Sequence, residues 1–258
     1  MNILLINTYY QPYNVGGAEI SVQLLAEELV RQGNEVIVIT LGDKAETRII
    51  NGVKVYYLGI QNLYLPATYD ANILQKALWH SLDSYNPLYK KKISHIIRNE
   101  SPDIIHTHNI SGFSVSIWKL VKQIFNLPII HTIRDYYLLC PRGRMYENQS
   151  RCNGQCSVCS VLSITKKNYS SKVDYVTGIS NYVLNKHLEN DYFPNVAGAK
   201  VISNPVDISA VKYEGIREPW QNGITLGFLG RLEPAKGIKY ILGEMMAIPS
   251  VQLLVGGS

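Results

Sequence analysis

Short apolar runs, separated by stretches with helical spacing, restrict the fold of this chain more than any other feature. Each run is too short and too β-branched for a helix, and several lack polar–apolar alternation, as strands covered on both faces do. The runs are Ile3–Ile6, Val36–Thr40, Val53–Leu58, Ile104–His106, Ile129–Thr132, Tyr175–Ile179 and Val201–Ile202. They predict a largely parallel sheet.

The first two runs enclose a predicted helix at Gly17–Gln32, where apolar residues recur on one stripe and Gly33 follows as a terminating glycine. Strand, glycine loop, helix and strand predict a right-handed βαβ unit. Asn86-Pro87 predicts the start of a helix that runs to Asn99, and Ser180 predicts the N-cap of Asn181–Glu189. The alternation predicts one doubly wound, Rossmann-like α/β domain over residues 1–205.

A second, shorter pattern follows a Pro- and Gly-containing linker at 206–222. It predicts a strand at Ile224–Leu229, a loop at Gly230–Lys236, a helix at Gly237–Met246 and a strand at Val251–Val255. One βαβ unit buries too little apolar surface to offset its conformational entropy alone. We therefore expect residues 223–258 to be the truncated beginning of a second Rossmann-like domain, and the chain to be a fragment.

Composition narrows the classes of partner. The chain has 258 residues, is 46% hydrophobic and carries a net charge of +5. It has neither a run of the ~18 apolar residues that span a bilayer nor the basic start of a signal peptide, which predicts a cytoplasmic protein. The charge suits an anionic small molecule, or peripheral contact with the inner membrane surface, rather than nucleic acid. For the basic run Lys90–Lys92 we favour a solvated helix face over a lipid contact.

A glycine pair follows the first strand, in the segment that ends Gly16-Gly17-Ala18-Glu19. Unpaired amides at a helix start, beside the positive end of the helix dipole, suit a phosphate or a sugar hydroxyl. The pair is not the three-glycine dinucleotide fingerprint, which disfavours a nicotinamide enzyme. We favour a functional role over a plain turn.

Two further strands end in chemically active residues. His108 lies where the run Ile104–His106 becomes a loop, at the edge where α/β ligands collect, and is a candidate site residue; for His106 we favour a structural role. After the strand at Ile129–Thr132, Arg134 could recognise an anionic or polyhydroxylated acceptor and Asp135 could orient its hydroxyl. The alternative is a surface ion pair of little energy.

Arg142 lies on the same predicted acceptor-binding loop, next to the four cysteines of the chain, Cys140, Cys152, Cys156 and Cys159. Their spacing on a Gly/Asn/Ser-rich loop suits a structural zinc site as well as it suits idle thiols, with an iron–sulfur cluster as a minor alternative. A disulfide is disfavoured in a reducing cytosol.

Arg231 and Lys236 lie on the strand-to-helix loop of the second pattern, between Gly230 and Gly237. Two cations beside free backbone donors are what a diphosphate leaving group needs as charge builds on it. The alternative is a solvated loop. This loop is the most specific single signal in the chain.

Four segments in this order resemble family 4 glycosyltransferases of GT-B fold: Gly16-Gly17-Ala18-Glu19, Pro102–His108, Ser203–Asp207 and Gly230–Gly237. The resemblance implies a retaining transferase that uses a sugar nucleotide and needs no metal for catalysis. It implies an acceptor-side first domain and a donor-side second domain.

By position, the resemblance places Arg231 and Lys236 on the donor diphosphate, and the amides of Gly16 and Gly17 opposite the donor phosphate or sugar. It places His108 at the transferred sugar. A saccharide or lipid-linked acceptor in cell-surface polysaccharide synthesis would fit.

Two departures from the family pattern stand out. Arg134-Asp135 stands where many relatives have His-Asp, and the paired glutamates that hold donor sugar and ribose lie beyond residue 258. We therefore expect this polypeptide alone to transfer no sugar at a useful rate. The competing interpretations are a non-catalytic GT-B-like scaffold and a GT-B sugar-nucleotide epimerase.

Overall fold

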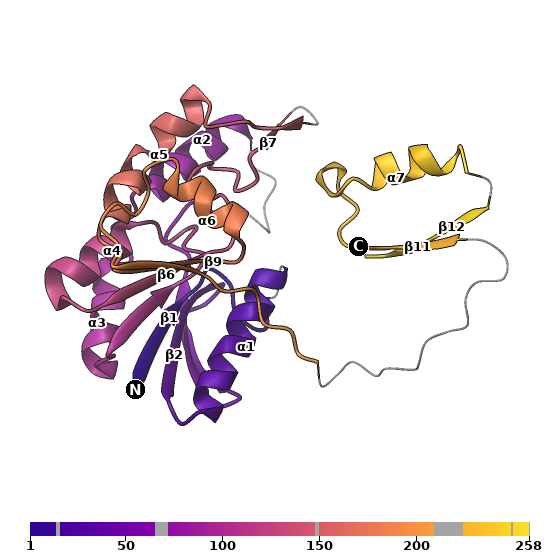
Figure 1. Ribbon diagram of the computed structural model, residues 1–258. Helices are drawn as coiled ribbons and strands as arrows, with labels where there is room; N and C mark the ends of the chain where they lie inside the picture. The colour runs from indigo at the N-terminus through magenta and orange to yellow at the C-terminus, as the bar shows by residue number, and fades with distance from the viewer. Residues whose placement is uncertain (14–15, 65–71, 148–149, 209–223, 249, 258) are drawn as a thin grey trace. The chain divides into compact units, whose positions relative to one another are not determined.

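A computed structural model describes residues 1–258 apart from 14–15, 65–71, 148–149, 209–223, 249 and 258 (Figure 1). The chain forms two compact units. Unit 1 comprises Met1–Met145 and Gly154–Asp207, and unit 2 comprises Tyr146–Asn153 and Ile208–Ser258. Most of the predicted linker 206–222 lies outside the described residues.

Unit 1 is built on an eight-stranded sheet with the order β10-β9-β6-β5-β1-β2-β4-β3. All neighbouring strands run parallel except β3, which is antiparallel to β4 at one edge. The predicted doubly wound sheet is confirmed, with the addition of this unexpected edge strand. The strands are β1 Asn2–Ile6, β2 Glu35–Gly42, β3 Glu46–Ile50, β4 Val53–Gly59, β5 Ile104–Thr107, β6 Ile129–Ile133, β9 Tyr175–Gly178 and β10 Gly198–Val201.

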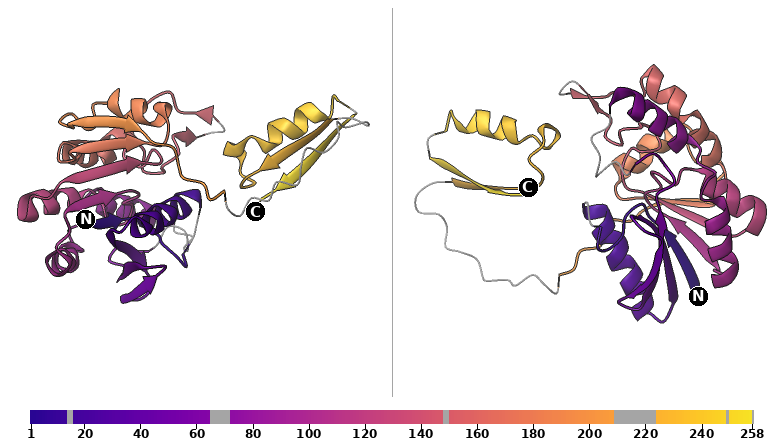
Figure 2. Two further views of the ribbon diagram at one scale, coloured as in Figure 1. Left: turned by 60° about the horizontal axis from the view of Figure 1, so that its bottom comes forward. Right: turned by 180° about the vertical axis from the view of Figure 1, so that it is seen from behind.

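Helices flank this sheet, as Figure 2 shows. They are α1 Gly17–Arg31, α2 Ile73–Ser84, α3 Lys90–Glu100, α4 Ser116–Leu120, α5 Ser157–Ser170 and α6 Asn181–Leu188, and a π-helical turn at Val121–Phe125 continues α4. Among the described residues, none of the helices combines the length and the apolar character needed to cross a bilayer.

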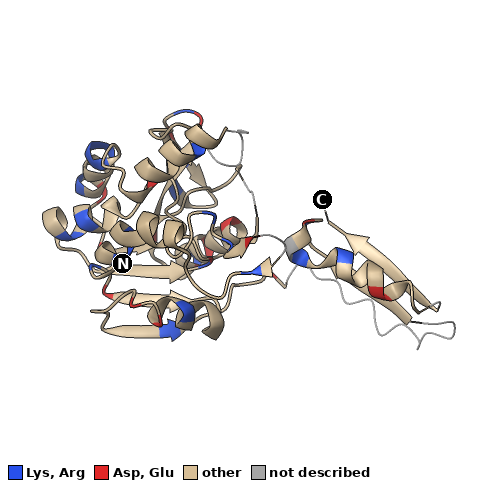
Figure 3. Cartoon of the chain, turned by 90° about the horizontal axis from the view of Figure 1, so that it is seen from above, with Lys and Arg blue, Asp and Glu red and all other residues tan. Residues whose placement is uncertain are grey.

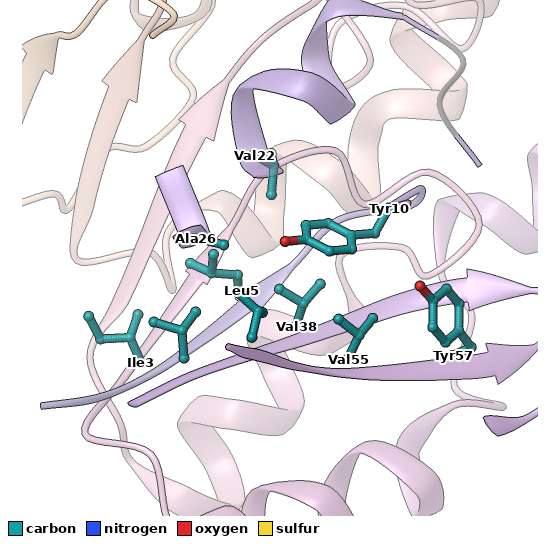
Figure 4. Close-up of a cluster of buried hydrophobic side chains, with 10 residues drawn as sticks. Ile3, Leu5, Tyr10, Val22, Ala26, Val38, Val55 and Tyr57 are labelled. Atoms are coloured by element: carbon teal, nitrogen blue, oxygen red, sulfur yellow. The ribbon is translucent and has the colours of Figure 1, made fainter. Parts of the chain in front are cut away.

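The core under α1 explains why the first βαβ unit forms. Val22 and Ala26 of α1 are fully buried against Leu5 of β1 and Val38 of β2 (Figure 4). Tyr10 joins the same cluster, so the first residues after β1 are held by packing. The loop that leads to α1 therefore starts from a fixed position at the carboxyl end of β1.

Two predicted boundaries are wrong. The third helix begins at Lys90, not at Pro87. Asn86 is fully buried and does not cap it: its Nδ2 donates to the carbonyl of Gly112 at 3.0 Å, and its Oδ1 accepts from the amide of Leu88 at 3.0 Å. The side chain ties two loops together, which a local capping argument cannot detect.

The last strand of the sheet is β10 at Gly198–Val201 rather than Val201–Ile202. Its register pairs Gly198 with Tyr175 and Lys200 with Thr177. The strand is an exposed or half-buried edge, so its first residues need no apolar side chains. The apolar pattern of the sequence therefore reveals only the last residue of β10.

Unit 2 contains the predicted second βαβ pattern. The parallel strands β11 Ile224–Leu229 and β12 Val251–Gly256 enclose a 3₁₀ turn at Pro234–Lys236 and helix α7 Ile238–Met245. No residue of α7 is buried among the described residues. The antiparallel pair β7 Tyr146–Glu147 and β8 Ser150–Arg151 also belongs to this unit.

Candidate functional site

The carboxyl ends of three neighbouring strands form the candidate site. β6, β5 and β1 are adjacent and parallel, so the residues that follow each of them meet at one edge of the sheet. The edge is held together by hydrogen bonds between strand ends: Asn7 Oδ1 accepts from the amide of Asn109 at 3.0 Å, and Thr8 Oγ1 donates to the carbonyl of Ser111 at 2.7 Å.

His108 stands out at this edge, as the sequence predicted. Its side chain is 2% exposed, and neither ring nitrogen has a hydrogen-bond partner among the described residues. It lines a cavity of about 10 Å³ with Arg134, Asp135 and Tyr137, about the smallest volume that holds a water molecule. Burying two polar nitrogens without partners costs free energy, so the ring is arranged for a partner that the described residues do not supply.

Burial also sets the protonation state of His108. Burial holds the pKa of the His108 ring well below its usual value, and the neighbouring His106 lowers it further. The ring is therefore neutral near pH 7, with one nitrogen donating and the other accepting. This state suits a sugar hydroxyl, which can do both, better than general acid catalysis.

His106 and its neighbour His131 are structural, as we expected for His106. His106 Nε2 lies 2.7 Å from Thr132 Oγ1, and His131 Nδ1 lies 2.9 Å from Thr107 Oγ1. Burial lowers the pKa of each ring to about 3. They support the strand ends as neutral side chains.

Arg134 lies beside His108 in the same cavity. Its Nη1 donates to Asn204 Oδ1 at 2.5 Å, while its buried Nε has no hydrogen-bond partner among the described residues. Burial lowers the pKa to about 10 and Glu19 opposes this, so the guanidinium stays charged at neutral pH. Arg134 therefore brings a positive charge to the cavity lining, and its Nε–H has no acceptor in the described part of the chain.

Asp135 has a structural role that the sequence did not reveal. Its Oδ1 accepts from the amide of Tyr137 at 2.8 Å and so closes the turn after β6. Burial raises the pKa of this carboxyl, and the hydrogen bond from the Tyr137 amide and then the charge of Lys166 partly offset the rise. Asp135 is at the cavity, as predicted, but its carboxylate is committed in part to the turn.

Sequence reasoning missed the buried pair Lys166 and Asp83, which supports this turn from behind. Lys166 Nζ lies 3.6 Å from Asp83 Oδ2, 3.1 Å from the carbonyl of Tyr137 and 3.4 Å from the centre of the Tyr137 ring. The side chains of Lys166 and Asp83 are 2% and 1% exposed. Because they are 83 positions apart in sequence, no local pattern could have paired them.

Gly16 and Gly17 begin α1 at the same sheet edge, but local geometry does not demand glycine at either. Gly16 is extended, and a Cβ on Gly17 would meet no atom within 4 Å. As N-cap residue, Gly16 offers no side chain to the first-turn amides. Glu19, in the first turn of α1, is 6% exposed, and its charge raises the pKa of Arg134. The position of Glu19 in the glycine motif could have suggested this interaction.

Arg142 is exposed on the turn Cys140–Gly143 and, unlike Arg134, is not among the residues that line the cavity of His108. Arg231 and Lys236 lie in unit 2. Lys236 is the last residue of the 3₁₀ turn before α7, and Arg231 precedes that turn. Arg231 Nη1 pairs with Glu233 Oε1 at 3.0 Å, a competitor for any anion at this loop.

The cysteines do not share one loop, contrary to expectation. Cys156 is the N-cap of α5 and Cys159 lies in its first turn. Burial raises the pKa of the Cys159 thiol to about 12, and the thiols of Cys156 and Cys140 add to the rise as hydrogen-bonding neighbours. Cys152 belongs to unit 2. Within the residues that the structure describes, no three His, Cys, Asp or Glu side chains are grouped as a metal site.

Comparison with known proteins agrees with the fold. The model of Glycosyltransferase Family 4 matches residues 15–210. An uncharacterized 42.6 kDa protein in a cps region of Klebsiella pneumoniae is 38% identical over 245 residues, which cover 92% of this chain and 63% of that protein. An uncharacterized glycosyltransferase of Methanocaldococcus jannaschii is 28% identical over 100% of this chain and 63% of its own length. The chain thus spans about 63% of these relatives.

Solved structures share the fold. Sucrose-phosphate synthase from Thermosynechococcus elongatus superposes over 100% of this chain and 62% of its own, with a TM-score of 0.69 at 19% identity. The trehalose-6-phosphate synthase OtsA covers 99% of this chain with a TM-score of 0.58 at 9% identity. At these identities the likeness concerns the fold.

Proposed function

The chain belongs to glycosyltransferase family 4, and from that premise we propose that it serves a retaining transfer of a sugar from a nucleotide-sugar donor to a saccharide or lipid-linked acceptor. We assign the reaction to cell-surface polysaccharide or glycoconjugate synthesis. The 38% identical relative in a cps region supports this assignment.

One observation carries the proposal: His108, neutral, buried and without a hydrogen-bond partner among the described residues, lies beside the charged Arg134 at the carboxyl edge of the sheet. His108 would hold a hydroxyl of the transferred sugar, with its nitrogens as donor and acceptor. Arg134 would bind the acceptor through its unused N–H, and Asp135 would orient the attacking hydroxyl. Lys166 and Asp83 act as positioning residues, because they support the turn on which Asp135 lies.

In unit 2, Arg231 and Lys236 would stabilise the departing diphosphate. In unit 1, the amides of Gly16 and Gly17 at the start of α1 would bind a phosphate or a sugar hydroxyl. Preorganised positive groups at a leaving phosphate can supply much of the acceleration without a strong general base. Such a leaving group would compete with Glu233 for Arg231, and a divalent anion attracts a cation more strongly than one carboxylate does.

The test is turnover by the protein at its natural length, measured as release of nucleoside diphosphate from a panel of nucleotide sugars. We expect Arg231→Ala with Lys236→Ala, and separately His108→Ala, to reduce kcat/KM by at least about a hundredfold. Lys239→Ala, which removes an exposed cation from the adjacent helix, is the matched control. Normal turnover by the double variant would refute the assignment of the diphosphate site, and an inverted anomer in the product would refute retention.

A further inference from the structure

Three of the four cysteines meet where helix α5 begins. Cys156 is the N-cap residue of α5, and Cys159 lies three positions further, in the first turn. The thiol of Cys159 has two hydrogen-bonding neighbours, the thiols of Cys156 and Cys140, although Cys140 comes from the loop after β6. We call Cys140, Cys156 and Cys159 the thiol cluster.

Hydrogen bonds outside the thiols hold the thiol cluster together. Gln155, just before α5, donates through Nε2 to the carbonyl of Leu139 at 2.7 Å, so the start of the helix is held beside Cys140. The amide of Cys140 donates to the carbonyl of Tyr136 at 2.7 Å, within the turn that follows Asp135. The cluster therefore arises because α5 packs against this turn, and the spacing of cysteines along the chain does not explain it.

The three thiols differ in their access to solvent. Cys156 is exposed, Cys159 is half-buried and Cys140 is buried. A reagent in solution therefore meets Cys156 first. A thiol that then reacts with the modified Cys156 must already be in contact with it, and Cys159 is in contact with it.

The start of α5 also suits the form of sulfur that reacts. A thiol attacks a disulfide as its thiolate, and the positive end of a helix stabilises an anion. The first turn of α5 carries no acidic residue, and residues 148–173 contain no Asp or Glu at all. Figure 3 shows Lys and Arg on helices of unit 1. Neighbouring charges in the sequence therefore do not oppose an anion at Cys156.

We propose that Cys156 and Cys159 form a redox-active pair that is reversibly oxidised by a low-molecular-weight disulfide such as glutathione disulfide. The Cys156 thiolate attacks one sulfur of glutathione disulfide, so a bond between Cys156 and glutathione forms and one glutathione thiolate leaves. The Cys159 thiolate then attacks the Cys156 sulfur and releases the second glutathione. The two protein thiols thus lose two electrons and two protons, which the two glutathione molecules carry away.

The geometry of the first turn permits this bond. Residues three positions apart on a helix have Cβ atoms about 5–6 Å apart, and a disulfide needs about 3.5–4.5 Å, so a small adjustment closes it. Because Cys156 is exposed, the bond is open to reduction. Such a transient disulfide differs from the permanent one that a reducing cytosol disfavours. The proposal goes beyond the transfer reaction and does not depend on it.

The test treats the whole chain with about 1 mM glutathione disulfide and locates the products by mass spectrometry after alkylation of the remaining thiols. Trypsin should leave Cys152, Cys156 and Cys159 on one fragment, residues 152–166, in which a disulfide should join Cys156 to Cys159. Dithiothreitol should restore both thiols. Cys159→Ser should accumulate glutathione on Cys156, and Cys156→Ser should slow the loss of the Cys159 thiol at least about tenfold.

Cys152→Ser is the matched control, because Cys152 lies on the same fragment but belongs to unit 2. It should form the disulfide at an unchanged rate. Serine is a favoured N-cap residue, so Cys156→Ser should not lower the urea unfolding midpoint. A glutathione adduct that persists on Cys156 of the unaltered chain, or a disulfide that involves Cys152, would overturn the proposal. A tightly bound metal ion that keeps all the thiols from reacting would overturn it as well.

Discussion

Acidification should unfold unit 1 through its buried histidines. Burial lowers the pKa of His106 and His131 to about 3 and that of His187 to about 4. The unfolded chain binds protons at these rings below pH ~6.5 while the folded chain does not, so stability falls as pH decreases between about 6.5 and 3–4. The sign follows from the extra protons bound by the unfolded state.

The size of the effect can be worked out. Between pH 7.5 and 5.5 each of the three rings costs about 1.4 kcal/mol, which gives about 4 kcal/mol in total. His108 adds to this in the same direction. The raised pKa of Asp135 acts in the opposite sense, but for one group only. A loss of about 4 kcal/mol is a large fraction of the 5–15 kcal/mol typical of a domain.

The assay is urea unfolding at pH 7.5, 6.5 and 5.5. With a urea dependence of about 2 kcal/mol/M, the midpoint should fall by about 2 M. His131→Asn keeps a side-chain polar group for Thr107 but cannot titrate, so it should reduce the pH dependence by about a third of that contributed by the three rings. His95→Gln, on the exposed side of α3, is the matched control. A midpoint that is unchanged between pH 7.5 and 5.5, or a pH dependence insensitive to His131→Asn, would refute the reasoning.

Three further predictions concern stability and metal content. Gly17→Ala should leave the free energy of unfolding unchanged or raise it by up to about 1 kcal/mol. Gly178→Ala should lower it by about 1–3 kcal/mol in urea unfolding, because the added Cβ would lie 2.6 Å from the Cβ of Leu184. Equal costs for the two variants would contradict this prediction. Lys166→Met should lower the free energy of unfolding by about 3–5 kcal/mol, because it leaves the Asp83 carboxylate buried without its cation. Adding Asp83→Asn should recover most of this loss in thermal unfolding. No recovery would argue against the ion pair. Elemental analysis should find about one zinc per chain if the four cysteines hold a structural metal, and less than half an equivalent would exclude it.

The sequence predicted the sheet well because its inner strands are continuous apolar runs. It missed α2, whose outward Ile73, Leu74 and Leu78 hide the helical periodicity of the buried side. It also missed β3 at Glu46–Ile50, a largely exposed edge strand with little apolar signal. Both misses arise where the pattern of side chains is not set by the core.

The sequence could predict where the candidate site lies, but not the hydrogen bonding of its side chains. Strand ends alone place His108, Arg134 and Asp135 at one edge, as the structure confirms. Whether a buried ring has hydrogen-bond partners depends on side chains far away in sequence. That the described residues offer none to the ring nitrogens of His108 could therefore not be foreseen. The support of the Asp135 turn by Lys166 is likewise a tertiary property.

The central strand pairing has a consequence for how this protein acquires its structure. Ile3 of β1 pairs with Ile104 of β5, across 101 positions of chain. Contacts between such distant segments form slowly, because the intervening chain must lose entropy before the pairing rewards it. During synthesis, the first βαβ unit can emerge and pack early, but the edge that carries His108 can close only after residue 104 has left the ribosome.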